Sequence, residues 1–148
     1  MKREPVIDIA HLVTRFGDTV LHEDISLTIE RGEVFAIAGA SGCGKSTLLR
    51  EMVMLMPPYA GRIRVLGHDI AHLSTAKAAR LRRRWAMMFQ GGALFSGLTV
   101  AENVALPLRE HTDLTREDID ELAHIKIALA GLPADSANKY PRELSGGL

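Results

Sequence analysis

The sequence predicts an α/β fold, and three observations predict it. Apolar and polar residues alternate with the period of a strand before residue 30, and with the period of a helix after residue 91. Between these parts, a glycine-rich segment at residues 39–47 follows an apolar run and precedes a helical segment. We therefore expect an antiparallel sheet packed beside an α/β core, followed by a helical part.

Strands are expected where short runs alternate or are continuously apolar and are bounded by turn residues. Such runs lie at residues 6–12, 24–29, 34–38, 62–66 and 85–89. The first two alternate, as half-buried strands do, whereas the runs at 34–38 and 85–89 are continuously apolar, as buried strands are. Turns at residues 14–18 and 30–33 separate the first three strands.

Helices are expected at residues 47–56, 75–84 and 100–109, and between Thr115 and Gly131. The first ends where Pro57 and Pro58 turn the chain, because proline cannot continue a helix. The last begins with a hydroxyl cap at Thr115 and an acidic first turn, and it stops at Gly131 and the proline that follows.

The composition is that of a soluble globular protein of one domain, with 148 residues, 47% hydrophobic and 24% charged. The formal net charge is zero, so no overall field attracts nucleic acid or an anionic membrane, and we expect no nucleic-acid partner. No apolar run approaches the roughly 18 residues of a membrane span, and the N-terminus does not read as a signal peptide. The single cysteine, Cys43, allows no internal disulfide, which fits a reducing cytoplasm.

The glycine-rich segment has the form G-x-x-x-x-G-K-[ST] of a phosphate-binding loop. It consists of Gly39, Ala40, Ser41, Gly42, Cys43, Gly44, Lys45, Ser46 and Thr47. Its glycines let backbone N–H groups turn toward phosphate oxygens, and the following helix adds its unpaired N–H groups. Lys45 can reach the β- and γ-phosphates, and the Ser46 hydroxyl can bind Mg²⁺. A chance match in a glycine-rich turn is the alternative, but the strand before and the helix after favour a nucleoside triphosphate site.

Two further features have more than one interpretation. Cys43, near helix N–H groups, is either a reactive thiol or only the small residue that the loop requires. The basic run at residues 80–84 marks either a nucleic-acid or lipid-headgroup site, or a solvated helix end whose cations complement the helix dipole. The net charge of zero favours the second interpretation of the basic run.

Other motifs accompany the phosphate loop in a fixed order. Phe16 precedes it, Phe89 and Gln90 follow an apolar run after it, and Leu-Ser-Gly-Gly occupies residues 144–147. With these motifs the whole chain resembles the nucleotide-binding subunit of an ATP-binding-cassette (ABC) transporter. The resemblance implies that Phe16 stacks on adenine, and that Gln90 contacts Mg²⁺ and the attacking water.

The final motif matches the family's signature. The resemblance implies that Ser145, Gly146 and Gly147 contact, in trans, the γ-phosphate held by a partner subunit. It further implies an ABC-type ATPase that uses ATP and Mg²⁺ as a head-to-tail homodimer. Such a dimer attaches to a membrane permease subunit, peripherally, at the cytoplasmic face of the inner membrane.

The segment after Gln90 indicates a branch of the family. Residues 90–110 are similar to the corresponding stretch of the ATPases of Mla (maintenance of lipid asymmetry), toluene-tolerance and Mce-associated phospholipid transport systems. The family places this segment against the permease. The resemblance also implies one nucleotide-binding domain at residues 1–148. Its β subdomain and phosphate loop lie at 1–90, and its helical subdomain up to the signature lies at 91–148.

The family pattern continues beyond the signature with a strand that ends in the Walker B aspartate and catalytic glutamate, and then with a switch histidine. None of these stands within the 148 residues. We therefore expect the C-terminal part of the cassette to be missing, and the chain alone to bind ATP without hydrolysing it. The alternatives are a catalytically silent ATP-binding module, and a soluble ABC protein of translation or DNA repair. A generic phosphate-loop kinase or GTPase is disfavoured by the signature.

Overall fold

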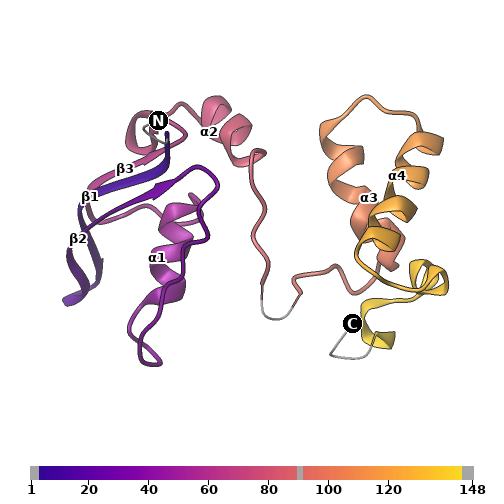
Figure 1. Cartoon of the computed structure of the whole chain (residues 1–148), viewed down its shortest axis with the longest axis horizontal. Coiled ribbons are helices and arrows are strands. Elements are labelled where there is room, and N and C mark those ends of the chain that lie inside the picture. The colour runs from indigo at the N-terminus through magenta and orange to yellow at the C-terminus, as the bar shows by residue number, and fades with distance from the viewer. Residues whose placement is uncertain (1–3, 90–91, 145–148) are drawn as a thin grey trace. The chain divides into compact units, whose positions relative to one another are not determined.

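The computed structural model of the chain describes residues 4–89 and 92–144. The chain divides into two compact units, Met1–Met87 and Met88–Leu148, whose α-helices and longer strands are labelled in Figure 1. Hydrophobic clusters lie within each unit. The phosphate loop belongs to the first unit, and the helical segments after residue 91 belong to the second.

The first unit contains a four-stranded antiparallel sheet with the strand order β2-β1-β3-β4. Its strands are β1 (Pro5–Phe16), β2 (Thr19–Glu30), β3 (Ala60–Val65) and β4 (His68–Asp69). The register pairs Ile9 of β1 with Leu27 of β2 on one side and with Ile63 of β3 on the other, so apolar side chains lie beside one another. The antiparallel sheet and the strands predicted at 6–12, 24–29 and 62–66 are confirmed. β1 continues to Phe16 and β2 begins at Thr19, so the turn predicted at 14–18 is wrong for residues 14–16.

The helix α1 (Lys45–Met52) packs against this sheet. The buried residues of the shared core are Ile9, Leu12, Leu48, Met52, Ile63, Val65 and Leu81. α1 begins and ends earlier than the helix predicted at residues 47–56. It ends at Met52 because the N–H groups of Met54 and Leu55 return to the carbonyls of Glu51 and Arg50, at 3.1 and 2.8 Å, a pairing that closes a helix C-terminus.

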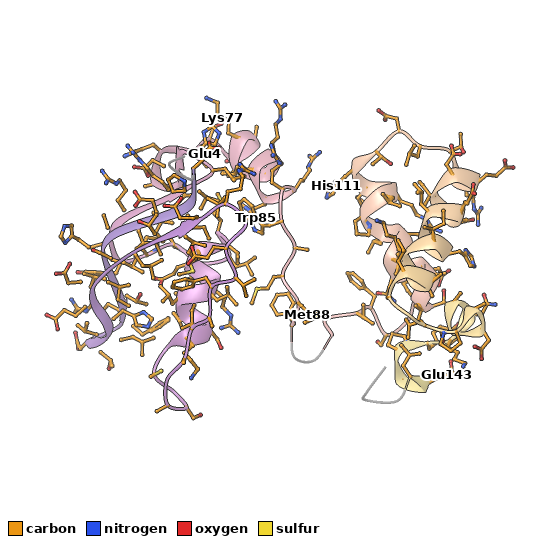
Figure 2. All side chains as sticks on the ribbon, viewed as in Figure 1. Glu4, Lys77, Trp85, Met88, His111 and Glu143 are labelled. Carbon is orange, nitrogen blue, oxygen red and sulfur yellow. The ribbon has the colours of Figure 1, made fainter. Side chains whose placement is uncertain are left out.

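The strands predicted at residues 34–38 and 85–89 are wrong, because neither segment is a strand. Val34 is 98% exposed and Met88 is 95% exposed. A strand requires a neighbour to complete its hydrogen-bond ladder, and no strand within residues 4–89 and 92–144 pairs with either segment. Trp85 nevertheless packs against the core, and its indole N–H donates to a backbone carbonyl just after α1 at 3.3 Å (Figure 2).

Two short helical elements follow β4 in the first unit. They are the 3₁₀ turn η1 (Ile70–His72) and the helix α2 (Thr75–Arg82). The Ser74 side chain caps α2 by accepting from the Lys77 N–H at 3.4 Å. Leu81 of α2 reaches the core described above. The helix predicted at residues 75–84 is confirmed apart from its last two residues.

The second unit is helical. It consists of α3 (Val100–His111), α4 (Arg116–Leu129) and the 3₁₀ turns η2 (Ala134–Asn138) and η3 (Pro141–Glu143). Two buried clusters hold it together, formed by Ala105, Ile119 and Ala123 and by Val100, Ile127 and Ala137. The predicted helices at 100–109 and after Thr115 are confirmed, and α3 extends to His111.

Both long helices begin with a threonine cap. The Thr99 hydroxyl accepts from the Glu102 N–H at 3.2 Å, and the Glu102 carboxylate accepts from the Thr99 N–H at 2.7 Å. This reciprocal pairing is a capping box. Thr115 accepts from the Asp118 N–H at 3.2 Å, which confirms the cap predicted there.

The Thr99 cap gives a first prediction. Thr99→Ala removes the acceptor for the Glu102 N–H, and we expect the free energy of unfolding to fall by about 1 kcal/mol. Chemical denaturation followed by circular dichroism measures this. Thr99→Ser keeps the cap, so it should stay within about 0.5 kcal/mol of the wild type. An equal loss in both variants would contradict the capping argument.

Candidate phosphate-binding site

The phosphate loop opens directly into α1. Gly44 is the N-cap residue, in the left-handed conformation with φ of 93°, and no side chain caps the helix. The N–H groups of Ser46 and Thr47 donate to no backbone carbonyl within the part of the chain that the structure describes. The first turn also carries no acidic residue. An anion is therefore favoured here, both by the unpaired N–H groups and by the helix dipole.

Lys45 lies over the loop that precedes it. Its Nζ donates to the carbonyl oxygens of Gly39 and Ala40, at 3.0 and 2.7 Å, and lies 3.7 Å from the Sγ of Cys43. These partners are neutral, whereas hydrogen bonds from an ammonium group to a charged oxygen are stronger. A phosphate oxygen would therefore be a stronger acceptor for the Lys45 ammonium group than the two carbonyl oxygens are. Cys43 is exposed and free.

The imidazole of His22, on β2, packs against the N-cap glycine. A Cβ built on Gly44 would collide with the Nε2 of His22, and would meet its Cε1 at 2.8 Å and a methyl group of Leu21 at 2.9 Å. The ring thus occupies the space that any larger residue would need. Both this packing and the positive φ require glycine at the start of α1.

A buried chain of hydrogen bonds continues from His22 away from the loop. The Nδ1 of His22 lies 2.9 Å from the Thr14 hydroxyl on β1. That hydroxyl donates to the carboxylate of Glu51 on α1, with oxygen distances of 2.8 and 2.9 Å. Burial raises the pKa of the Glu51 carboxyl above its ordinary value of 4.5, while the Thr14 hydrogen bond and the nearby His22 act in the opposite direction.

Sequence reasoning did not select these three residues. Glu51 follows Leu48 at the helical spacing of the core face, so an acid at an apolar position was the available signal. Glu51 is 0% exposed. An ionisable residue is almost never fully buried without a partner, and the partner here is Thr14.

Phe16, the predicted adenine-stacking residue, ends β1 beside the turn into β2. Phe16 is 52% exposed, so about half of its surface is accessible to a ligand. The neighbouring Arg15 donates to the Gly17 carbonyl and to Asp18, the latter at 2.9 Å, and lies over the Tyr59 ring at 5.4 Å. These contacts fix the turn that carries Phe16.

Other predicted site residues lie outside the described part of the chain. They are Gln90 and, in the signature motif, Ser145, Gly146 and Gly147. Their predicted roles stay predictions.

The basic run at residues 80–84 closes α2. Arg80 and Arg82 stand in its last turn, as expected for cations that complement a helix dipole. Arg80 and Arg84 also line a hollow of about 400 Å³ together with His68, His72, Leu73, Lys77 and Leu81. Lys77, one of these lining residues, lies in the first turn of α2 (Figure 2).

The described helices and side chains set two bounds on the site. None of these helices combines the length and the apolar character that crossing a membrane would require. Within residues 4–89 and 92–144, no group of three or more histidine, cysteine or acidic side chains could hold a metal ion.

The fold and this loop define a nucleotide-binding α/β protein with a phosphate loop before α1. The sequence matches the ABC transporter family over residues 22–148. The chain belongs to this family, as its ATP-binding part, which confirms the resemblance drawn from the motifs.

Relatives in the family carry different names. The chain is 39% identical over 96% of its length to the probable ribonucleotide transport ATP-binding protein mkl of Mycobacterium tuberculosis, covering 39% of that protein. It is 38% identical over 97% of its length to the intermembrane phospholipid transport system ATP-binding protein MlaF of Haemophilus influenzae, covering 54%. The methionine import ATP-binding protein MetN of Rhizobium johnstonii is 44% identical over 97% of the chain, which covers 39% of it.

Solved structures confirm the fold class. A bacterial ABC transporter cassette solved as a dimer superposes with a TM-score of 0.86 at 29% identity, over 95% of this chain and 64% of that one. The protein cbiO1 of Clostridium perfringens, part of an ABC transporter complex, gives 0.81 at 27% identity, over 99% and 57%. The chain therefore spans only part of the length of each relative.

The buried carboxyl gives a prediction about pH. Because the folded-state pKa of Glu51 is raised, its contribution to stability is fully present below about pH 4.5 and is lost as the pH rises through the raised value. We therefore expect the free energy of unfolding of the wild type to fall as the pH rises through this range. Glu51→Gln, which cannot titrate, should lack it. Denaturant unfolding across this range measures both proteins.

The exposed Glu23 of β2 supplies the control for this prediction. Glu23→Gln also removes a carboxylate, but one that water solvates, so it should retain the decline of the wild type. If Glu51→Gln and the wild type show the same pH dependence, the buried carboxyl is not its source.

Proposed function

We propose that the chain is the ATP-binding subunit of an ABC transporter, and that residues 39–47 bind the phosphates of ATP. The observation that carries the proposal is the uncapped N-terminus of α1, with Gly44 at the N-cap and Lys45 directly after it. Backbone N–H groups and a lysine ammonium are the groups that bind β- and γ-phosphates in phosphate-loop proteins. Lys45 would exchange its neutral carbonyl partners for phosphate oxygens.

Mg²⁺ fits the same site. The Ser46 hydroxyl stands in the first turn of α1, where it would be a ligand beside the phosphate oxygens, and Gln90 would contribute a second side-chain ligand and orient water. The hard cation prefers such oxygen ligands. When bound, it neutralises charge on the phosphates.

The adenine base would stack on Phe16. A half-exposed ring at a turn held by Arg15 supports this proposal, because stacking needs an open aromatic face and no particular hydrogen-bond pattern.

The assembly that we propose is a head-to-tail dimer on a membrane permease at the cytoplasmic face of the inner membrane. In it, Ser145, Gly146 and Gly147 would close over the γ-phosphate of the partner subunit. A dimeric relative of known structure supports the dimer. The segment after Gln90 would contact the permease.

Phospholipid is the cargo that we propose. The similarity to a phospholipid transport ATP-binding protein over 97% of the chain supports it, together with the resemblance of residues 90–110 to that branch. Other relatives are named for methionine import and for ribonucleotide transport, and these are the alternative cargoes.

A single substitution tests the nucleotide site. We expect Lys45→Ala to weaken binding of a fluorescent ATP analogue at least tenfold, because the loop loses the cation that meets the phosphates. The matched control is Lys77→Ala, which removes an exposed lysine from the first turn of α2. This variant should bind the analogue as the wild type does. Equal affinity in Lys45→Ala and the wild type would contradict the proposal.

We also expect the 148-residue polypeptide alone to hydrolyse ATP no faster than Lys45→Ala.

A second experiment tests the cargo. In proteoliposomes that contain the complete ATPase with its permease, phospholipid should raise the rate of ATP hydrolysis, whereas methionine and ribonucleotides should not. Stimulation by either of the latter would reject phospholipid as the cargo. A complete ATPase that forms no complex with a permease would favour a soluble ABC protein, and binding without turnover would favour a silent module.

A further inference from the structure

Three polar side chains from three elements form one buried chain beneath the phosphate loop. Thr14 of β1, His22 of β2 and Glu51 of α1 are all buried, and Thr14 contacts both of the others. Burying polar groups is unfavourable unless they are hydrogen-bonded to one another. Removing the Thr14 hydroxyl is therefore unfavourable, since it leaves the buried groups of His22 and Glu51 without this hydrogen-bond partner.

The Thr14 hydroxyl couples its two neighbours. It has one proton to donate and lone pairs with which to accept, and it faces the Nδ1 of His22 and both carboxyl oxygens of Glu51. When Glu51 is ionised, the hydroxyl donates to it and accepts from the N–H at Nδ1. When Glu51 carries a proton, the carboxyl can donate to the hydroxyl, which then donates to a bare Nδ1, so the imidazole proton is at Nε2.

The far end of this chain is the phosphate loop. The Nε2 edge of His22 fills the space beside Gly44, and the Gly44 carbonyl accepts the first hydrogen bond of α1, from the Leu48 N–H at 2.9 Å. Glu51 lies in the last turn of the same helix. The chain of side chains thus holds α1 to the β1–β2 hairpin at both of its ends.

We propose that the chain Glu51–Thr14–His22 positions the phosphate loop for nucleotide binding, with His22 as the residue that sets the place of Gly44. The proposal rests on the proposed function, because it requires ATP at residues 39–47. It differs from a purely stabilising role in two respects. Breaking the Glu51–Thr14–His22 hydrogen bonds must change the affinity for nucleotide in protein that is still folded. Nucleotide binding must also change the environment of the His22 imidazole.

The first test replaces the middle of the chain. Thr14→Val keeps the shape of the side chain and deletes the hydroxyl. At a temperature well below the melting transition of each variant, we expect the Kd for the fluorescent ATP analogue to rise about tenfold, and Thr14→Ser to restore most of the affinity. Thr28→Val is the matched control, since it deletes an exposed hydroxyl of the same hairpin that donates to Asp8 at 3.2 Å.

The outcomes separate the possible failures. If Thr14→Val melts at a lower temperature but binds the analogue with unchanged Kd, the chain is only structural and the proposal is overturned. If Thr14→Ser is as weak as Thr14→Val, the hydroxyl is not the coupling group, which also overturns it. If the wild type itself does not bind the analogue, the proposed function fails before this inference is reached.

A second measurement needs no variant at residue 14. Imidazole nitrogen NMR of the wild type should show the His22 signals shifting when Mg·ATP is added, and not when it is added to Lys45→Ala. The exposed His124 of α4, which contacts the Asp120 carbonyl at 2.7 Å, should not shift in either protein. His22 signals that stay fixed as nucleotide saturates the wild type would overturn the proposal even if Thr14→Val does not fold.

Discussion

A helix that must begin without a cap is the constraint on which the first unit depends. In the second unit, α3 and α4 begin as most helices do, with Thr99 and Thr115 bonding the first N–H groups. α1 begins at Gly44 with no side-chain partner, so its N–H groups keep their capacity to bind an anion. The stability that a cap would supply comes instead from packing, since His22 and Leu21 crowd the N-cap glycine.

That packing explains why the antiparallel sheet accompanies the phosphate loop. The hairpin of β1 and β2 provides the apolar surface for Leu48 and Met52, and it also provides the polar partners of Glu51. The helix is therefore fixed by contacts on its flank and near its ends, while the loop in front of it remains irregular. A buried and hydrogen-bonded helix next to an irregular loop suits a pre-organised binding site.

The sequence was informative where a feature is local. Alternation predicted β1 and β2, the spacing of glycine and lysine predicted the loop, and Thr115 predicted the start of α4. Residues 34–38 and 85–89 could not be predicted in this way, because a strand exists only beside a partner and apolar content does not supply one. Nor could the role of Thr14, since its contacts with Glu51 join positions distant in sequence. The family was predictable from motifs, and the match over residues 22–148 confirmed it.

The two units also differ in how far apart in sequence their contacting residues lie, and this difference bears on the order of folding. The second unit is joined by near neighbours in sequence, through capping pairs such as Thr99 with Glu102 and through α3 packed on the helix that follows it. The first unit must bring Thr14 to Glu51, a separation of 37 residues, and must pair β1 with the distant β3. Closing long loops slows folding. Once its residues are available, the helical unit is therefore expected to gain its structure sooner than the first unit.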